Sequence, residues 1–190
     1  DSSLVSVLTS GDAPKSVQSM EVHRLAKTAY MTGGKVSMKE GVTGEINAET
    51  RMQFLMDFSD GKSKSITLEK NDGSSQTIEL TESTTISDVL NQLKDAGLNA
   101  SFDANQKRFY ISAKETGDAG NFKFTGDTGA LKALGMNIGK EIVDDTTNEI
   151  EEGGATLVRG QDASITLNGA EYTSTTNVFE IHGLTITALG

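Results

Sequence analysis

The chain has 190 residues, 17 basic and 27 acidic, and a formal net charge of −10 at pH 7. Its basic residues form no cluster, which argues against nucleic acid and against an anionic membrane surface as partners. It contains no cysteine, and this excludes a disulfide framework and thiol catalysis. No stretch approaches the ~20 consecutive apolar residues of a membrane-spanning helix. The length suits two small domains, each with its own core.

The first part of the chain predicts short strands. Residues 1–14 alternate weakly between apolar and polar, and indicate an edge strand or an ordered tail. Residues 16–31 fit either a strand or one face of a helix, and we favour a strand over Met20–His23 followed by a less regular stretch. Glycine pairs at 33/34 and at 41/44 then mark breaks.

A further strand and a hairpin are predicted next. The strand lies between residues 46 and 58, because its apolar residues alternate: Met52, Phe54, Met56 and Phe58. Asp60-Gly61 would turn it. The hairpin has an Asn-Asp-Gly turn at 71–73 between two alternating runs, whose apolar residues are Ile66, Leu68, Ile78 and Leu80.

The strongest helix signal spans residues 86–96. Apolar side chains recur there at the spacing of one helical face: Ile86, Val89, Leu90 and Leu93. Thr85 is placed to cap the start, and Asp88 completes a capping-box pattern. Gly97 stands where a left-handed residue ends many helices, and Leu98 can fold back on the last turn. Start, stop and buried face therefore agree on one helix.

A second hairpin is predicted after this helix. Its turn is at 103–105, and its inward residues are Leu98, Ala100, Phe102, Phe109, Ile111 and Ala113. The two hairpins and the helix would make a β-β-α-β-β unit over residues 66–113, in which the helix covers one face of one sheet. A short strand at 122–124 and a helical turn or two at 131–134 follow.

The rest of the chain divides into a connection and a run of strands. Residues 137–154 are acidic and poorly patterned, and we interpret them as a connection that carries Asp144, Asp145, Glu149, Glu151 and Glu152. Asn168-Gly169 is a strong hairpin signal between a strand at 163–167 and a return that begins at Tyr172. One last strand is predicted to hold Ile181, Leu184, Ile186 and Ala188.

Residues able to catalyse a reaction are sparse. The two histidines, His23 and His182, lie in no recognisable catalytic pattern, and the chain has no Gly-x-Ser-x-Gly elbow. Ser59-x-x-Lys62 matches a Ser-Lys pattern formally, but it lies in an Asp-Gly turn rather than at a helix start. We interpret both histidines as strand-surface residues, and predict no catalytic residue and no enzymatic activity.

Phosphate-binding and metal sites are not predicted either. Gly33-Gly34-Lys35 resembles the end of a phosphate-binding loop, but Ala29 stands where the first glycine is required and Val36 replaces the Ser or Thr. The acidic turn at 57–61 hints at calcium, yet its glycine comes one position early for an EF-hand loop. The acids of 137–154 lack the rigid spacing that paired catalytic carboxylates need. We predict no cofactor and no metal.

Three stretches carry a family resemblance. The first is Ser19–Lys27, an alternating segment that ends in a Leu-Ala pair, and the second is Thr85–Gly117, with its helix and following hairpin. The third joins Gly160-Gln161-Asp162-Ala163, Asn168-Gly169, Thr176–Val178 and Ile181–Ile186. Together they resemble the bacterial flagellar filament-cap family, also called hook-associated protein 2. The second stretch is similar to a module shared with flagellins and hook proteins, whereas the third resembles the cap family in particular.

The resemblance implies a structural cap at the tip of the flagellar filament. Such caps are annular oligomers beneath which exported flagellin subunits fold and insert, so it implies flagellin and further copies of the chain as partners. The location would be extracellular, reached by type III export without a cleaved signal peptide. The family's β-rich head domains form the outward plate, which can contact host mucin or glycans. Because the family's terminal coiled coil has no counterpart here, we expect a central fragment of a longer protein.

The expected architecture is α+β and β-rich, with a β-β-α-β-β unit inserted into a discontinuous, mainly antiparallel β domain. Residues 1–43 and 155–190 are assigned to the discontinuous domain, and residues 44–154 to the inserted one, with a single main helix near 86–96. Two alternatives to a cap stay open. One is a flagellin-like or hook-filament junction structural protein, and the other is a surface adhesin module.

Overall fold

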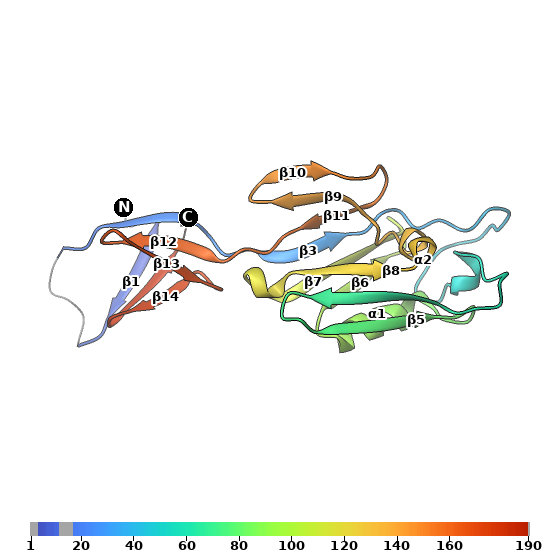
Figure 1. The fold of residues 1–190 in the computed structure, drawn as a ribbon, viewed down its shortest axis with the longest axis horizontal. Coiled ribbons are helices and arrows are strands. Elements are labelled where there is room, and N and C mark those ends of the chain that lie inside the picture. Colours follow the sequence, from blue (N-terminus) through green and yellow to red (C-terminus); the bar gives the residue numbers. More distant parts are fainter. Residues whose placement is uncertain (1–3, 12–16, 190) are drawn as a thin grey trace.

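The computed structural model describes residues 4–11 and 17–189. This part of the chain is mostly β-strand, arranged in four sheets with mainly antiparallel pairing, and has two α-helices. Figure 1 shows an elongated molecule with a small body at one end, a large body at the other and a narrow waist between them. The β-rich fold expected from the sequence is confirmed.

The small body consists of two three-stranded sheets. Its strands are β1 (Val5–Thr9), β2 (Met20–Arg24), β12 (Ala163–Leu167), β13 (Ala170–Ser174), β14 (Val178–Ile181) and β15 (Leu184–Ala188). They pair in the orders β1-β15-β14 and β13-β12-β2. The core holds Ala163, Ile165, Leu167, Phe179, Leu184, Ile186 and Ala188. Both ends of the described chain therefore belong to this body.

The large body contains a six-stranded sheet, a three-stranded sheet and both helices. The larger sheet has the order β10-β9-β11-β3-β7-β6, with β3 (Thr28–Thr32), β6 (Asn99–Asp103), β7 (Arg108–Thr116), β9 (Ile138–Val143), β10 (Thr146–Glu149) and β11 (Ala155–Val158). The smaller has the order β5-β4-β8, with β4 (Lys64–Lys70), β5 (Ser75–Leu80) and β8 (Phe122–Gly126). The helices are α1 (Ile86–Asp95) and α2 (Thr128–Ala133).

The division between the bodies differs from the expected boundaries at 43 and 155. Ala29, Met31 and Val36, and likewise Ala155 and Leu157, are buried in the core of the large body. The reason is strand pairing, because β3 lies between β7 and β11 in the six-stranded sheet. The chain therefore crosses between the bodies near Lys27 and Gln161.

Helix α1 forms as its local sequence predicts. The Thr85 hydroxyl accepts from the Asp88 amide at 3.1 Å, and the Asp88 carboxylate accepts from the Thr85 amide at 2.8 Å. At the other end Gly97 has a φ of +87°, and the Leu98 amide donates to the Leu93 carbonyl at 3.1 Å. These bonds satisfy backbone groups that the helix itself leaves unpaired. The predicted buried face is also confirmed, with Ile86, Val89, Leu90 and Leu93 buried.

The two hairpins around α1 both form, but they do not share a sheet. Strands β4 and β5 pair with Ile66 opposite Ile78, while β6 and β7 pair with Ala100 opposite Ile111. The second edge of β4 is taken by β8, and the second edge of β7 by β3. The expectation that the helix covers one sheet built from both hairpins is therefore wrong, because each hairpin joins a different sheet through a strand that is distant in the sequence.

The strand expected between residues 46 and 58 is absent from the described structure. That segment contains an isolated bridge from Arg51 to Thr85 and a 3-10 turn, η1 (Met52–Phe54), in which the Leu55 and Met56 amides both donate to the Met52 carbonyl. Met52, Leu55 and Met56 are buried while Phe54 is 39% exposed. The apolar residues thus follow the spacing of a helical turn instead of strand alternation.

Strands also form where none was expected. Residues 137–154, interpreted as a connection, contain the β9–β10 hairpin, which turns at Asp144 and Asp145 with φ values of +47° and +62°. The less regular stretch expected after β2 contains β3. The single strand expected to span residues 181–188 is two strands, because His182 and Gly183 form a turn with φ values of +47° and +78°. The β9–β10 hairpin and β3 were not predicted because their apolar residues alternate poorly. The turn between β14 and β15 was not predicted because apolar residues lie on both sides of it.

The remaining predictions fall on described strands or just outside them. The edge strand expected in residues 1–14 is β1, which pairs with β15, although residues 1–3 and 12–14 lie outside the described residues. The Asn168-Gly169 turn is confirmed by φ values of +52° and +84° and by the pairing of β12 with β13. The strand at 122–124 is confirmed as β8 and the helical turn as α2.

Candidate functional site

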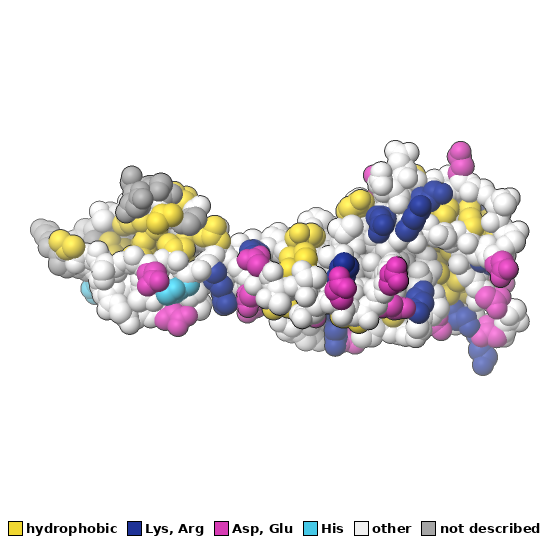
Figure 2. Space-filling model, turned by 90° about the horizontal axis from the view of Figure 1, so that it is seen from above, with side chains coloured by type: hydrophobic (Ala, Val, Ile, Leu, Met, Phe, Trp, Pro, Cys, Tyr) yellow, Lys and Arg dark blue, Asp and Glu magenta, His cyan; other side chains and the backbone are white. Residues whose placement is uncertain are grey.

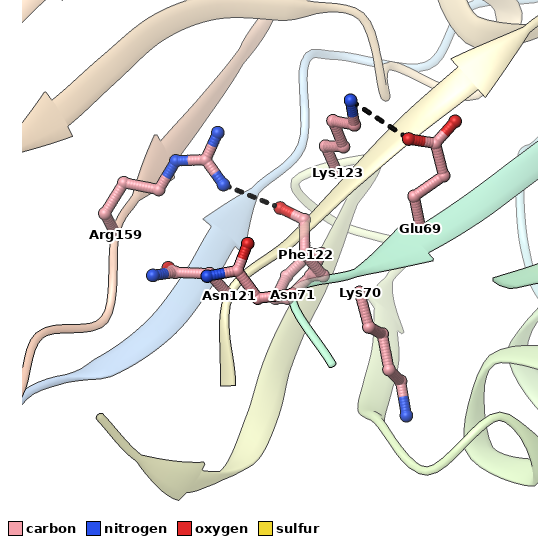
Figure 3. Close-up of a pocket in the computed structure, with 7 residues that line it drawn as sticks. All are labelled: Glu69, Lys70, Asn71, Asn121, Phe122, Lys123 and Arg159. Carbon is pink, nitrogen blue, oxygen red and sulfur yellow. Dashed lines mark hydrogen bonds and ion pairs between the residues drawn. The ribbon is translucent and has the colours of Figure 1, made fainter. Parts of the chain in front are cut away.

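The most developed polar site lies at the waist, formed by Leu25–Lys27, Gly117–Asn121 and Arg159–Asp162. A hollow of about 500 Å³ opens here on the side of the large body. Figure 3 shows its seven lining residues, which come from the end of β4, the start of β8 and the segment after β11: Glu69, Lys70, Asn71, Asn121, Phe122, Lys123 and Arg159. Arg159, Lys123 and Glu69 line this hollow with charged side chains, whereas the side chain of Lys70 points away from them, toward Gly97.

Arg159 is the fixed cation of this hollow. Its Nε donates to Glu141 Oε1 at 2.5 Å and its Nη1 donates to the Phe122 carbonyl at 3.1 Å. The side chains of Arg159 and Glu141 are 27% and 24% exposed. The guanidinium thus ties β9 to β8, and a charge-assisted pair of this kind holds its geometry better than an exposed one.

Lys123 and Glu69 form the second charged pair, with Nζ and Oε2 3.0 Å apart. Thr125 Oγ1 also donates to Glu69 Oε1 at 2.9 Å. The hydrogen bond from Lys123, followed by that from Thr125, lowers the pKa of Glu69 below its ordinary value. Because its carboxylate is already matched by two donors, Glu69 is suited to hold Lys123 in place rather than to accept a proton.

A second hollow, of about 360 Å³, adjoins the first and shares Asn71, Asn121 and Arg159 with it. Its other wall includes Arg24 from β2 and Asp144 from the β9–β10 turn, whose charged atoms are 3.9 Å apart. Next to it Lys27 Nζ lies 2.7 Å from Asp145 Oδ1. The acidic turn therefore contacts the two basic residues at which the chain enters the waist.

Beneath the hollows, the backbone of the waist is packed closely. Asn121 is buried, and its side chain both accepts from the Gly160 amide at 2.8 Å and donates to the Gly160 carbonyl at 3.0 Å. A Cβ on Gly160 would lie 2.7 Å from the Gly117 carbonyl oxygen and 3.0 Å from the Ala29 nitrogen. Position 160 therefore requires glycine for close approach of three segments.

The residues after Gly160 bind the small body to the large one. Gln161 Nε2 donates to the Leu25 carbonyl at 2.8 Å. Asp162 Oδ1 accepts from the Asp118 amide at 2.9 Å, and Arg24 Nε donates to the Asp162 carbonyl at 3.0 Å. Segment 160–162, noted in the sequence only for its family resemblance, thus bonds to the other crossing segment at Arg24 and Leu25 and to the turn after β7.

The residues weighed as catalytic candidates lie apart from one another. His23, on β2, has its Nε2 2.7 Å from Thr166 Oγ1, whereas His182 occupies the turn between β14 and β15. In the acidic turn, Asp57 accepts from the amide and hydroxyl of Ser59, and Asp60 pairs with Lys64. The carboxylates of Asp57 and Asp60 are therefore already engaged by hydrogen bonds and an ion pair with nearby residues of the chain.

The glycine pair weighed as a phosphate loop has a packing role. A Cβ on Gly33 would lie 3.0 Å from the Phe109 carbonyl oxygen, and one on Gly34 would lie 2.6 Å from the Gly153 carbonyl oxygen. Within residues 4–11 and 17–189, no three His, Cys, Asp or Glu side chains gather closely enough to hold a metal ion. No helix in the described part of the chain combines the length and apolar character needed to cross a membrane.

Sequence reasoning missed Asn121 and Arg159 entirely. Both act on partners far away in the chain, since Asn121 binds Gly160 and Arg159 binds Glu141 and Phe122. The neighbouring Gly160-Gln161-Asp162 run was singled out in the sequence only for its family resemblance, which indicated nothing about these contacts. Comparison of the chain with protein-family models, with curated proteins and with solved structures found no match in any of the three.

Proposed function

We propose that this chain is the head region of a flagellar filament-cap protein, a non-enzymatic structural protein at the extracellular tip of the filament. In the full-length protein it would associate into an annular cap and promote the folding and insertion of flagellin. On this proposal the large body is the inserted unit, with the strand-strand-helix-strand-strand order of the flagellar module, and the small body is the discontinuous β domain.

The observation that supports the proposal is the role of segment 160–162. It belongs to the stretch that resembles the cap family in particular, and each of its three residues makes hydrogen bonds at the junction of the two bodies. A plate that flagellin subunits push against needs bodies that keep their relative orientation. Buried, fully bonded polar groups provide that rigidity. A motif that keeps the waist rigid is therefore what such a head would require.

Gene deletion tests this function most directly. A strain without the full-length gene should produce short or absent filaments and release unpolymerised flagellin into the medium, seen by electron microscopy and by immunoblot of the supernatant. Complementation with the wild-type gene should restore filament length. Normal filaments in the deletion strain would refute the cap function. Normal filaments together with unchanged motility would also refute the flagellin-like alternative.

An adhesin function is a second candidate, favoured by one exposed face of the large body. Tyr30 on β3 and Tyr110 on β7 are 48% and 39% exposed. They are diagonal neighbours, because Tyr30 pairs with Ser112 and Tyr110 with Thr32. They line a shallow hollow of about 270 Å³ together with Asn99 and Ser101. Exposed aromatic rings beside hydroxyl and amide groups suit contacts with sugars, whose rings have apolar faces and polar rims.

Binding of the chain to mucin or to a glycan array would test this second candidate. Tyr30→Ala combined with Tyr110→Ala should abolish binding, while the matched exposed pair Val143→Ala and Ile150→Ala should leave it unchanged. Absence of binding by the wild-type chain would remove the adhesin alternative and leave the cap proposal intact.

A further inference from the structure

The edges of the four sheets are protected against pairing with other strands, except at β1. Each sheet ends in two edge strands, and every edge strand other than β1 carries at least one charged residue. On β2, β5, β6, β8, β10, β13 and β14, respectively, these include Glu21, Glu79, Asp103, Lys123, Glu149, Glu171 and Glu180. Charges on an edge discourage strand addition. Strand β1 is Val-Ser-Val-Leu-Thr and has no charge, no proline and no bulge.

The hydrogen-bond phase of β1 shows which backbone groups face outward. The Leu189 amide donates to the Leu4 carbonyl at 2.8 Å, and the Ser10 amide donates to the Gly183 carbonyl at 2.9 Å. In an antiparallel pair, alternate residues bond to the partner strand. The even-numbered residues 4 to 10 therefore face β15, and Val5, Val7 and Thr9 direct their amides and carbonyls to the outer edge, beyond which no described strand lies.

The side chains of β1 leave apolar surface at the same edge. Val7 lies opposite Ile186, on the face that forms the core, yet Val7 is 47% exposed while Ile186 is 1% exposed. Leu8, on the opposite face, is 70% exposed. Figure 2 shows hydrophobic side chains gathered on the small body at this end of the molecule. The core of the small body therefore continues to an edge that remains partly uncovered.

We propose that β1 pairs antiparallel with β1 of a second copy of this chain, about a two-fold axis at Val7. Val7 then lies opposite Val7 of the second copy and Val5 opposite Thr9, which pairs all the outward backbone groups. The sheets β1-β15-β14 of the two copies become one continuous sheet. The two Val7 side chains cover each other on the core face. This contact goes beyond the proposed function, and it is a symmetric contact rather than the head-to-tail contact of a ring.

A second copy fits this edge because it offers the same uncharged strand. The chain has a net charge of −10, so the repulsion between two copies is least where no acidic side chain enters the pairing. Strand β1 offers such an edge, and its sequence is compatible with itself when reversed about Val7. A single short strand pair buries less than the roughly 1,000 Å² expected of a stable interface. The dimer is therefore weak and forms at high protein concentration.

Cysteine cross-linking tests the contact and its register, because the chain has no cysteine of its own. Under mild oxidation Val7→Cys should give a disulfide-linked dimer, since opposed Cα atoms in such a pair lie about 5.5 Å apart, within disulfide range. Val5→Cys mixed with Thr9→Cys should cross-link, whereas Val5→Cys alone should not. Val178→Cys, a valine of 40% exposure on β14 at the other edge of the same sheet, is the matched control and should stay monomeric.

Sedimentation equilibrium over rising concentration gives the second readout. The wild-type chain should show a dimer, and Val7→Lys should weaken association by about tenfold or more, because two lysines would face each other across the pair. Thr147→Lys, on the exposed edge strand β10, should leave association unchanged, and circular dichroism should show both variants folded. The proposal is overturned if the chain stays monomeric and Val7→Cys does not cross-link, or if Val178→Cys cross-links equally well. It is likewise overturned if Val7→Cys cross-links only to an added protein such as flagellin.

Discussion

Asn121 and Gly160, 39 residues apart in the chain, form two hydrogen bonds with each other. The carboxamide oxygen of Asn121 accepts from the Gly160 amide and its nitrogen donates to the Gly160 carbonyl. Asn121 is only 8% exposed, so these bonds are largely shielded from bulk water. The Asn121 side chain therefore makes the two backbone hydrogen bonds that a neighbouring strand would otherwise make with Gly160, at the point where the chain passes between the two bodies.

Asn121→Ala should destabilise the protein by about 1–3 kcal/mol, because it leaves the amide and carbonyl of Gly160 buried without partners. Urea unfolding followed by circular dichroism measures the change. Asn99→Ala, at an exposed asparagine of β6, should alter the unfolding free energy by less than about 0.5 kcal/mol. Equal effects of the two substitutions would contradict the role assigned to Asn121.

Gly160→Ala tests the close approach of the segments at the waist. The new Cβ would clash with the backbone of Gly117 and Ala29 instead of with a flexible side chain, so we expect a loss of about 1–3 kcal/mol. Small-angle scattering should also show a wider distribution of distances between the two bodies. Gly11→Ala is the matched control, since a Cβ there meets no atom within 4 Å. An unchanged scattering profile for Gly160→Ala would show that the waist tolerates the extra atom.

The sequence predicts the parts of the fold that depend on neighbouring residues. Helix α1 has its cap, its buried face and its terminating glycine within residues 85–98, and all of these are confirmed. The Asn168-Gly169 turn is confirmed for the same reason. Each of these features depends on side chains a few positions apart, and their chemistry can be recognised without knowing what packs against them.

Strands whose partners are distant could not be predicted in this way. Strand β3 is a strand because β7 and β11 lie on either side of it, and β11 comes more than a hundred residues later. The β9–β10 hairpin carries polar side chains on both faces, so its alternation is weak. The contacts at the waist could not be predicted for the same reason, because Asn121, Arg159 and Gly160 bind partners that are distant in the sequence. Local pattern carries no information on such contacts.

The capping box of α1 offers a prediction confined to one element. Thr85→Ala removes the acceptor for the Asp88 amide and should cost about 1 kcal/mol of stability. Asn91→Ala, at an exposed position inside the same helix, should instead stabilise the protein by a few tenths of a kcal/mol, because alanine has the higher helix propensity. Thermal unfolding of both variants compares them with the wild type. Destabilisation by both would indicate that the helix depends on surface contacts rather than on its cap.

Stability should fall on the acid side of neutrality. Hydrogen bonds lower the pKa of Glu69, Glu149 and Glu151 below their ordinary value of 4.5. A carboxylate with a lowered pKa contributes stability that is present above its unfolded-state value and is lost as pH falls through its folded-state value. The unfolding free energy should therefore stay constant from pH 7 to about 5 and decrease below pH 4.5, with each exposed group contributing little.

Glu69→Gln identifies the share of this acid dependence that comes from the waist. Its carboxylate pairs with Lys123 and Thr125, so the variant should lose less stability than the wild type between pH 5 and pH 3, as measured by urea unfolding at each pH. Glu79→Gln, at an exposed glutamate of β5, provides the comparison. An acid dependence of Glu69→Gln identical to that of the wild type would show that the Glu69–Lys123 pair does not contribute to stability in solution.

The pair of Lys140 and Glu149 should respond to high pH instead. Because hydrogen bonding to Glu149 raises the pKa of Lys140, that pair should remain intact at pH 9 and lose its contribution to stability only as pH rises through the raised pKa of Lys140.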